Sequence, residues 1–195
     1  MRRGFKAEAE HISAEMRRLV GLSQNAPMAA RKLAKALDIV VMGPKEIPGI
    51  PEPLATQMLF DFGDKWSGVT IPVAGQTLII VNTGHSPARQ ESDLMHEIAH
   101  ILCKHKPARI DPPGELPWAS RSYDREQETQ AAWLGGCLQI PRSGLMAAVL
   151  KDLDNLAIGS LYGASPEMVS FRRNTSGVDS HLARRKRYAG SYYRQ

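Results

Sequence analysis

The chain has 195 residues and a mass of 21.5 kDa, a size that fits one globular domain with a small appendage. Hydrophobic residues make up 43% and charged residues 23%, which allows a sizeable core and excludes disordered chains, collagen-like fibres and coiled-coil rods. No apolar stretch approaches the roughly 20 residues of a membrane-spanning helix. The two cysteines suit a reducing compartment, so we expect a cytoplasmic protein.

Charge is distributed unevenly, with 25 lysine and arginine residues against 20 acidic ones. Much of the excess of basic residues lies late in the chain. From Arg172 onward there are Arg172, Arg173 and five further lysine or arginine residues, and Asp179 is the one acidic residue. We place a main domain over 1–142, a helical part over 143–180 and a basic tail over 181–195. The tail is either solvated and disordered or in contact with nucleic acid or an acidic partner.

The spacing of apolar residues, together with the prolines and glycines that mark turns and the ends of elements, predicts the elements of the first half of the chain. In chain order these are helices over 5–22 and 27–37, a strand over 38–42, a loop over 44–53, a helix over 54–62, and strands over 69–73 and 77–82. Pro27 is expected to begin the second helix, and Gly75 to form the turn between the last two strands. Pro72 cannot donate to a ladder, which favours a sheet edge for its strand.

In the second half we predict a helix over 89–103, a long proline-containing loop over 104–124 and a helix over 124–139. Two or three short helices follow over 143–175. The loop either gates access to a site between the two long helices or is a stiff connector.

The first long helix carries an H-E-x-x-H motif, in which His96 and His100 lie four residues apart. Residues at this spacing share one helix face, so both imidazoles can reach one metal ion. Glu97 is rotated by about 100° and can take a proton from a metal-bound water as that water attacks a carbonyl. Zinc suits nitrogen and oxygen ligands with one position left open, although manganese or another divalent ion fits the same ligands.

A third ligand has to come from another element, and the next helix offers Glu126 and Glu128. From Glu128 the residues at i+3, i+4 and i+7 are Ala131, Ala132 and Gly135, so this face is small and lets two helices approach closely. Glu126 projects about 200° away around the same helix. Geometry therefore favours Glu128 over Glu126 without excluding the latter.

The run from Arg89 to His100, followed by His105, resembles the ImmA/IrrE family of bacterial and phage metallopeptidases. The stretch from Glu128 to Arg142 is similar to the second signature of that family. In the family a glutamate thirteen residues before the proline is the third zinc ligand, which points to Glu128. The chain departs from the family at Ala132, where asparagine is common, and at the Leu-Leu pair, which here reads Leu-Gln.

The resemblance implies a zincin-like α/β (α+β) fold, with a small twisted sheet packed on the metal helix and a helical C-terminal part. It implies a bacterial or phage-encoded zinc endopeptidase, in which His96, His100 and Glu128 hold the metal and Glu97 is the catalytic base. Family members commonly cleave a helix-turn-helix repressor of the XRE type, which relieves repression during stress or in mobile elements.

Four other residues have both a structural and a functional interpretation. Cys103 and Cys137 are expected to be small core residues, although Cys103, seven positions after His96, lies on the helix face that carries the two histidines. His105 either ends the metal helix or flanks the site, and we favour the structural role. Tyr123 is an accessory candidate, as a donor to the oxyanion of a tetrahedral intermediate.

The segment 156–169 resembles a helix-turn-helix, with Gly163 in the turn, Ser165 as N-cap and Pro166 at the first helical position. Recognition helices read DNA with their N-terminal residues, and here these include Glu167, which opposes phosphate. Packing or repressor docking is therefore favoured over direct DNA binding. The alternative function is a non-enzymatic regulatory or toxin–antitoxin component that binds a repressor or DNA through this helical part.

Overall fold

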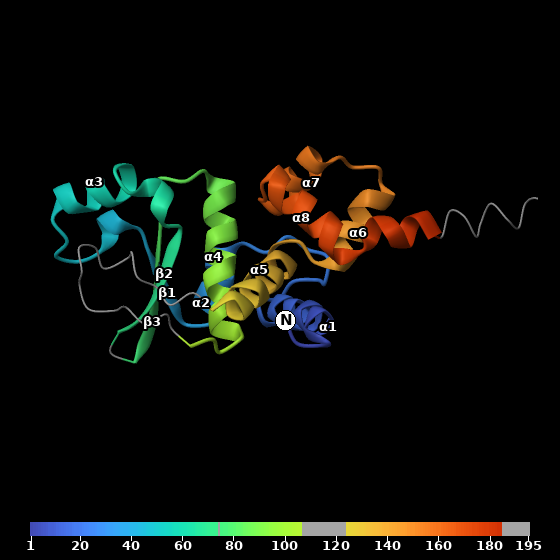
Figure 1. Cartoon of the computed structure of the whole chain (residues 1–195), viewed down its shortest axis with the longest axis horizontal. Helices are drawn as coiled ribbons and strands as arrows, with labels where there is room; N and C mark the ends of the chain where they lie inside the picture. The colour runs from blue at the N-terminus through green and yellow to red at the C-terminus, as the bar shows by residue number, and fades with distance from the viewer. Residues whose placement is uncertain (74, 107–123, 185–195) are drawn as a thin grey trace, which may run out of the picture.

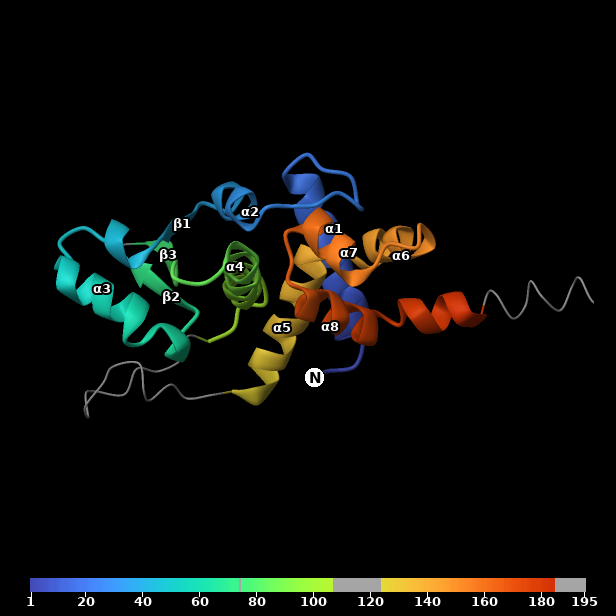
Figure 2. The same ribbon diagram turned by 90° about the horizontal axis from the view of Figure 1, so that it is seen from above.

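The computed structural model describes residues 1–73, 75–106 and 124–184 (Figure 1). A small sheet lies at one end of the molecule and the C-terminal helices lie at the other, with α4 and α5 between them (Figures 1 and 2). The strands are β1 (Ile39–Met42), β2 (Gly68–Val73) and β3 (Gln76–Val81). The α-helices with described bounds are α1 (Phe5–Leu19), α2 (Ala30–Ala36), α3 (Glu52–Phe60), α4 (Pro87–Leu102), α5 (Arg125–Gln139), α6 (Arg142–Leu150), α7 (Asn155–Tyr162) and α8 (Pro166–Ser176).

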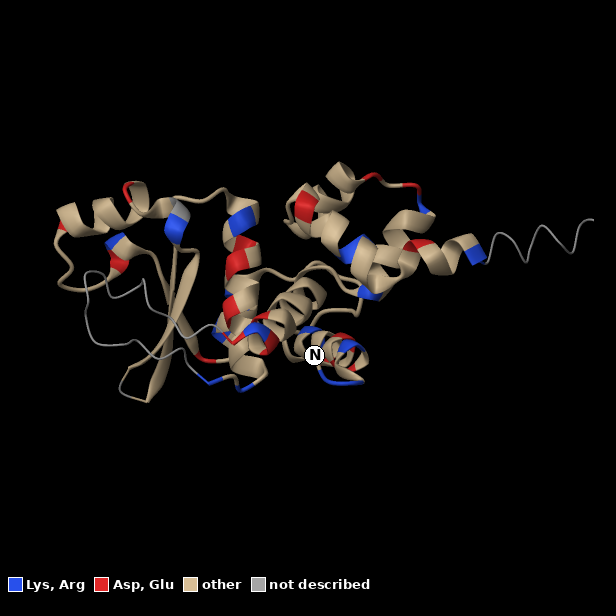
Figure 3. Ribbon diagram, viewed as in Figure 1, with Lys and Arg blue, Asp and Glu red and all other residues tan. Residues whose placement is uncertain are grey.

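The three strands form a sheet in the order β1-β3-β2. β1 pairs parallel with β3, and β2 pairs antiparallel with β3. β2 is therefore at one border of the sheet, as its proline predicts, and Pro72 lies opposite Thr77. None of the three strands contains a charged residue, and the charges of the molecule lie on helices and connections (Figure 3).

The predicted mixed α+β architecture, with a sheet packed on the motif helix and a helical C-terminal part, is confirmed. Most elements lie within two or three residues of their predicted bounds. The start of the second helix was predicted wrongly, because it begins at Ala30 and not at Pro27. The N–H of Ala30 donates to the carboxylate of Glu91 on α4, 2.8 Å away, so a distant side chain caps this helix.

Two hydrophobic clusters hold the molecule together. The larger joins α1, α2, the sheet, α4 and α5 around residues such as Leu33, Ile98 and Leu134. The smaller joins α6, α7 and α8 around Leu145 and Ile158. The proposed boundary near residue 142 stays a prediction. The predicted tail begins in helical residues, 181–184, and its remainder lies outside the described residues.

Two buried arginines lie where the clusters meet. The side chain of Arg17 donates to the carbonyls of Ala26 and Leu138, at 2.9 and 2.8 Å, and Arg172 donates to the carbonyl of Ile140 at 2.9 Å and pairs with Glu10. Arg172, which is one of the basic residues that accumulate late in the sequence, is therefore a buried residue of the fold. Buried guanidinium groups here satisfy carbonyls at the C-terminal end of α5, which that helix cannot satisfy itself.

Among the described residues, no helix combines the length and the apolar character that crossing a membrane requires.

Candidate metal centre

The motif histidines are positioned by α4, which begins with Ser86 as its N-cap and Pro87 as its first residue. One face of the helix enters the core through Met95 and Ile98, both fully buried. His96 and His100 leave the neighbouring face and remain about a quarter exposed. The same helix thus anchors itself in the core and presents two imidazoles toward α5.

Three side chains converge on one point between α4 and α5. The Nε2 atoms of His96 and His100 lie 3.1 Å apart, and Oε2 of Glu128 lies 3.1 Å from Nε2 of His96. The second carboxylate oxygen of Glu128 lies 3.6 Å from Nε2 of His100. Ligand atoms of one tetrahedral zinc ion are about 3.3 Å apart, given bonds of about 2.0–2.1 Å. The spacing of these three groups matches a shared metal.

The donor set also fits a metal on chemical grounds. Two imidazole nitrogens that face each other at 3.1 Å are held together by a proton or by a cation. Burial, and then the neighbouring His96, lower the pKa of His100 to about 4, so its ring is neutral at physiological pH and offers a lone pair. Within the described residues, His96, His100 and Glu128 form the cluster whose geometry could hold a metal ion.

A glycine on α5 brings Glu128 close enough to the histidines. A Cβ atom at Gly135 would lie 3.2 Å from both N and Cα of His96, which is tighter than an ordinary contact. The small face predicted for this helix therefore meets α4 at the motif itself. Asp124 caps the helix by accepting from the N–H groups of Glu126 and Gln127. Glu126 points away from the cluster and contacts the N-terminal ammonium group at 3.3 Å.

Glu97 lies against the edge strand β2. The hydroxyl of Thr70 donates to Oε2 of Glu97 across 2.5 Å. A Cβ atom at Gly68 would lie 2.8 Å from Cγ of Glu97, so only glycine leaves room for the glutamate here. Neither Thr70 nor Gly68 was predicted as a site residue, because no local signal in the sequence relates β2 to a helix 27 residues further on.

His105 contacts the other side of a candidate ligand. Its Nδ1 lies 2.9 Å from Nδ1 of His100, and its Nε2 lies 3.0 Å from Oε1 of Gln130. A histidine that binds metal through Nε2 carries its proton on Nδ1, so His100 donates to His105 and His105 donates to Gln130. This contact fixes the ring of His100, and it places His105 beside the site and not merely at the end of α4.

The remaining candidates lie elsewhere. Cys103 packs against the larger hydrophobic cluster and Cys137 is fully buried in it, as the core interpretation predicts. Burial raises the pKa of the Cys103 thiol to about 11, and it raises that of Cys137 further. Tyr123 and most of the loop before α5 lie outside the described residues.

Comparison with known protein families assigns most of the chain to one family. The family model described as the IrrE N-terminal-like domain, a peptidase family, matches residues 57–174, which is more than half of the chain. This span includes β2, the motif helix α4, the glutamate helix α5 and most of the C-terminal helices. Neither the comparison with curated proteins nor that with solved structures found a match. The chain belongs to the family of IrrE N-terminal-like metallopeptidase domains.

Proposed function

We propose that the protein is a zinc-dependent endopeptidase, and one observation carries the proposal. The ligand atoms of His96, His100 and Glu128 converge within 4.8 Å of one another, and Glu97 directly follows His96 on the motif helix α4. Three protein ligands and one open position are the arrangement of catalytic zinc sites, whereas structural zinc sites have four protein ligands.

When bound, zinc supplies a Lewis acid that polarises a peptide carbonyl and lowers the pKa of water. The carboxylate of Glu97 then accepts a proton from the attacking water and returns it to the nitrogen of the leaving amine. The hydroxyl of Thr70 donates to Oε2 of Glu97, which leaves Oε1 as the oxygen that receives the proton. His105 holds the ring of His100 in the orientation that directs Nε2 to the metal.

The edge of β2 that pairs with no other described strand is the proposed place for the substrate backbone. One edge of β2 pairs with β3, and the carboxylate of Glu97 is hydrogen-bonded to Thr70 in the middle of β2. A substrate that adds to this strand as an extended segment would pass beside Glu97 and the three ligands. Pro72 withholds one donor near the end of β2, so pairing would be strongest over the first residues of the strand.

We propose an intracellular helix-turn-helix repressor of the XRE type as the substrate. Support comes from the family of the chain and from the helical part that follows the site. In that part α7 ends at Gly163, which has a φ of 62°, and Ser165 caps α8 by accepting from the N–H of Met168. The first turn of α8 carries Glu167, which favours docking to a protein over contact with DNA phosphates.

The direct test incubates the zinc-loaded protein with the repressors encoded next to its gene and identifies products by mass spectrometry. We expect one repressor to be cut at one site, and Glu97→Gln to abolish the cut while retaining zinc. Absence of cleavage of every neighbouring repressor would contradict the proposed substrate. Cleavage of unrelated short peptides by the same preparation would instead support a peptidase with another substrate.

The second candidate is a non-enzymatic regulator that binds DNA or a repressor through α7 and α8. The turn at Gly163 and the cap at Ser165 favour it, because they have helix-turn-helix geometry. Salt-dependent DNA binding that Glu97→Gln leaves unchanged, in a protein without peptidase activity, would replace the enzymatic proposal with this one.

A further inference from the structure

The second border of the sheet is formed by β1, on the side away from β2 (Figure 2). β3 pairs with one edge of β1, and in the described parts of the chain no strand pairs with the other. Apart from the ladder to β3, its four residues make no backbone hydrogen bond to another described residue. Alternate N–H and C=O groups of this edge are therefore available to an additional strand.

This edge carries none of the charged residues or prolines that often prevent pairing at the border of a sheet. Its sequence is Ile-Val-Val-Met, which contains neither a charged residue nor a proline. Sheets that end in water usually carry such residues at the border, because an unprotected edge pairs with other chains. An apolar border of this kind is typical of a strand that receives a partner.

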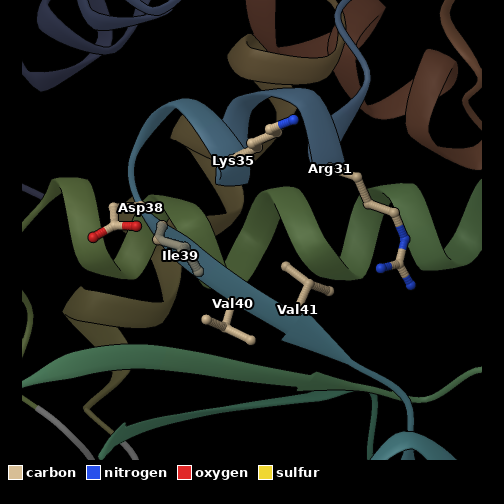
Figure 4. A pocket seen from close by; sticks show the side chains of 6 residues that line it. All are labelled: Arg31, Lys35, Asp38, Ile39, Val40 and Val41. Atoms are coloured by element: carbon tan, nitrogen blue, oxygen red, sulfur yellow. The ribbon is translucent and has the colours of Figure 1, made fainter. Parts of the chain in front are cut away.

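A pocket of about 260 Å³ runs along the same edge (Figure 4). It is lined by three consecutive residues of β1, which are Ile39, Val40 and Val41. Because neighbouring side chains of a strand point to opposite faces, three in a row can line one pocket only along the backbone edge. Val40 and Val41 indeed lie on opposite sides of the β1 ribbon in Figure 4.

The other wall of the pocket is positively charged. Arg31 and Lys35 lie one turn apart on α2 and are exposed, and neither forms an ion pair with another described residue. Four residues of helix rise about 6 Å, and two residues of a strand rise about 6.6 Å. Two acidic residues separated by one residue in an extended segment therefore match this basic pair. Asp38, at the opposite end of the pocket from Arg31, disfavours further acidic residues there (Figure 4).

We propose that the edge of β1 binds an extended polypeptide segment of a partner protein, in which acidic residues face α2 and alternate with apolar residues. The backbone of the segment pairs with β1, its acidic side chains contact Arg31 and Lys35, and its apolar side chains cover the half-buried Val40 and Met42. A second copy of the chain fits less well, because antiparallel pairing of two β1 edges brings the basic pairs of both copies together.

The binding site is separate from the metal centre, which lies toward the opposite border of the sheet. It does not depend on the proposed peptidase activity, so its test uses binding alone. A short fluorescent peptide in which glutamate alternates with valine is titrated with the full chain, and anisotropy is measured. We expect saturable binding by the wild type and equal binding by Glu128→Ala, a variant of the metal site.

Charge-reversal variants test the basic wall of the pocket. The double variant Arg31→Glu, Lys35→Glu should bind the peptide at least about tenfold more weakly. The matched control is Lys32→Glu, which changes an exposed lysine of the same helix outside the pocket and should leave binding unchanged. Equal loss in Lys32→Glu, or none in the double variant, would overturn the proposal, as would failure of the wild type to bind.

Backbone methylation tests the strand pairing. Two further peptides carry N-methyl groups on alternate residues. One is methylated at the odd positions and the other at the even positions, so each peptide loses the N–H donors along one of its two edges. We expect one peptide to lose binding and the other to retain it. Retention by both would show that no strand is added to β1. Self-association of the wild type without peptide binding would overturn the proposal and show that the edge pairs with a second copy.

Discussion

The two ends of α5 use polar groups for opposite purposes. At its N-terminal end, Glu128 meets His96 and His100 in a region that solvent reaches, and these three side chains form the candidate ligand set. At its C-terminal end, the carbonyls of Cys137, Leu138 and Ile140 accept hydrogen bonds from Ser13, Arg17 and Arg172, whose side chains are buried. One helix thus carries a candidate reactive group at one end and is anchored by buried cations at the other.

The comparison shows why the fold needs its buried charges. The last carbonyls of a helix have no partner within the helix, and leaving them unpaired in the interior costs about 1–3 kcal/mol each. α5 has no basic residue in its last turn, so cations from α1 and α8 take that position. They fix α5 against both neighbours, and this fixes the position of Glu128 relative to α4.

The largest effect is expected from removing a buried cation. Arg172→Met leaves the carboxylate of Glu10 without its ion pair and the carbonyl of Ile140 without its donor. We expect a loss of about 3–5 kcal/mol in the free energy of unfolding, measured by urea denaturation. The control is Arg173→Met, which removes the partly exposed pair with Asp179 and should cost about 1 kcal/mol or less. Equal losses in the two variants would contradict a special role for the buried site.

The metal-free protein should lose stability on acidification because of His100. Burial lowers its pKa from 6.5 to about 4, so between these values the unfolded chain binds more protons than the folded one. This contribution to stability is complete above about pH 6.5 and is lost as the pH falls toward 4. We expect about 2 kcal/mol after allowing for partial exposure.

Urea denaturation of the metal-free protein at a series of pH values measures this effect. His100→Gln removes the titrating group and should flatten the profile between pH 4 and 6.5. A wild-type protein whose stability is unchanged or increases toward pH 4 would show that the ring is not held neutral.

Substitutions at two neighbouring glycines test the two ends of α5 independently. Gly135→Ala places a Cβ atom against the backbone of His96, and we expect about tenfold weaker zinc binding from the displaced ligands. Gly136→Ala instead places a Cβ atom 2.8 Å from Cδ of Arg172. It should lower stability by about 1 kcal/mol, part of the strain being offset by higher helix propensity, without changing zinc affinity. Competition with a fluorescent chelator distinguishes the two, and equal weakening by both variants would show that the ends are not independent.

The smallest effect concerns the orientation of Glu97. Thr70→Val removes the hydroxyl that donates to its carboxylate but keeps the shape of the side chain. One hydrogen bond of about 1 kcal/mol corresponds to about a fivefold loss in kcat/KM for cleavage. Thr70→Ser should retain the rate, and both variants should retain zinc. A full rate in Thr70→Val would indicate that β2 does not position the base.

The parts of the fold that could be predicted are those with local signals. The spacing of His96 and His100, the proline and serine at the start of α8, and the proline in β2 all act within a few residues. Their elements lie close to where the sequence places them. The small face of α5 likewise predicts the close approach to α4 that Gly135 makes.

The parts that could not be predicted depend on partners distant in the chain. Glu91 caps α2 from more than sixty residues away, so the first residue of that helix has no signal nearby. A buried arginine such as Arg172 cannot be distinguished in sequence from an exposed one, since its burial depends on Glu10, 162 residues earlier. His105 was close enough to its partner to be found, because it follows His100 by five residues just after the helix ends.

The central claim is that His96, His100 and Glu128 hold one metal ion, and the metal content of purified variants tests it most directly. Elemental analysis should find about one zinc per chain in the wild type and in Glu126→Ala, the matched variant two residues away on the same helix. It should find almost none in Glu128→Ala. Full zinc occupancy in Glu128→Ala, or a wild type that cannot be loaded with any divalent metal, would contradict the claim.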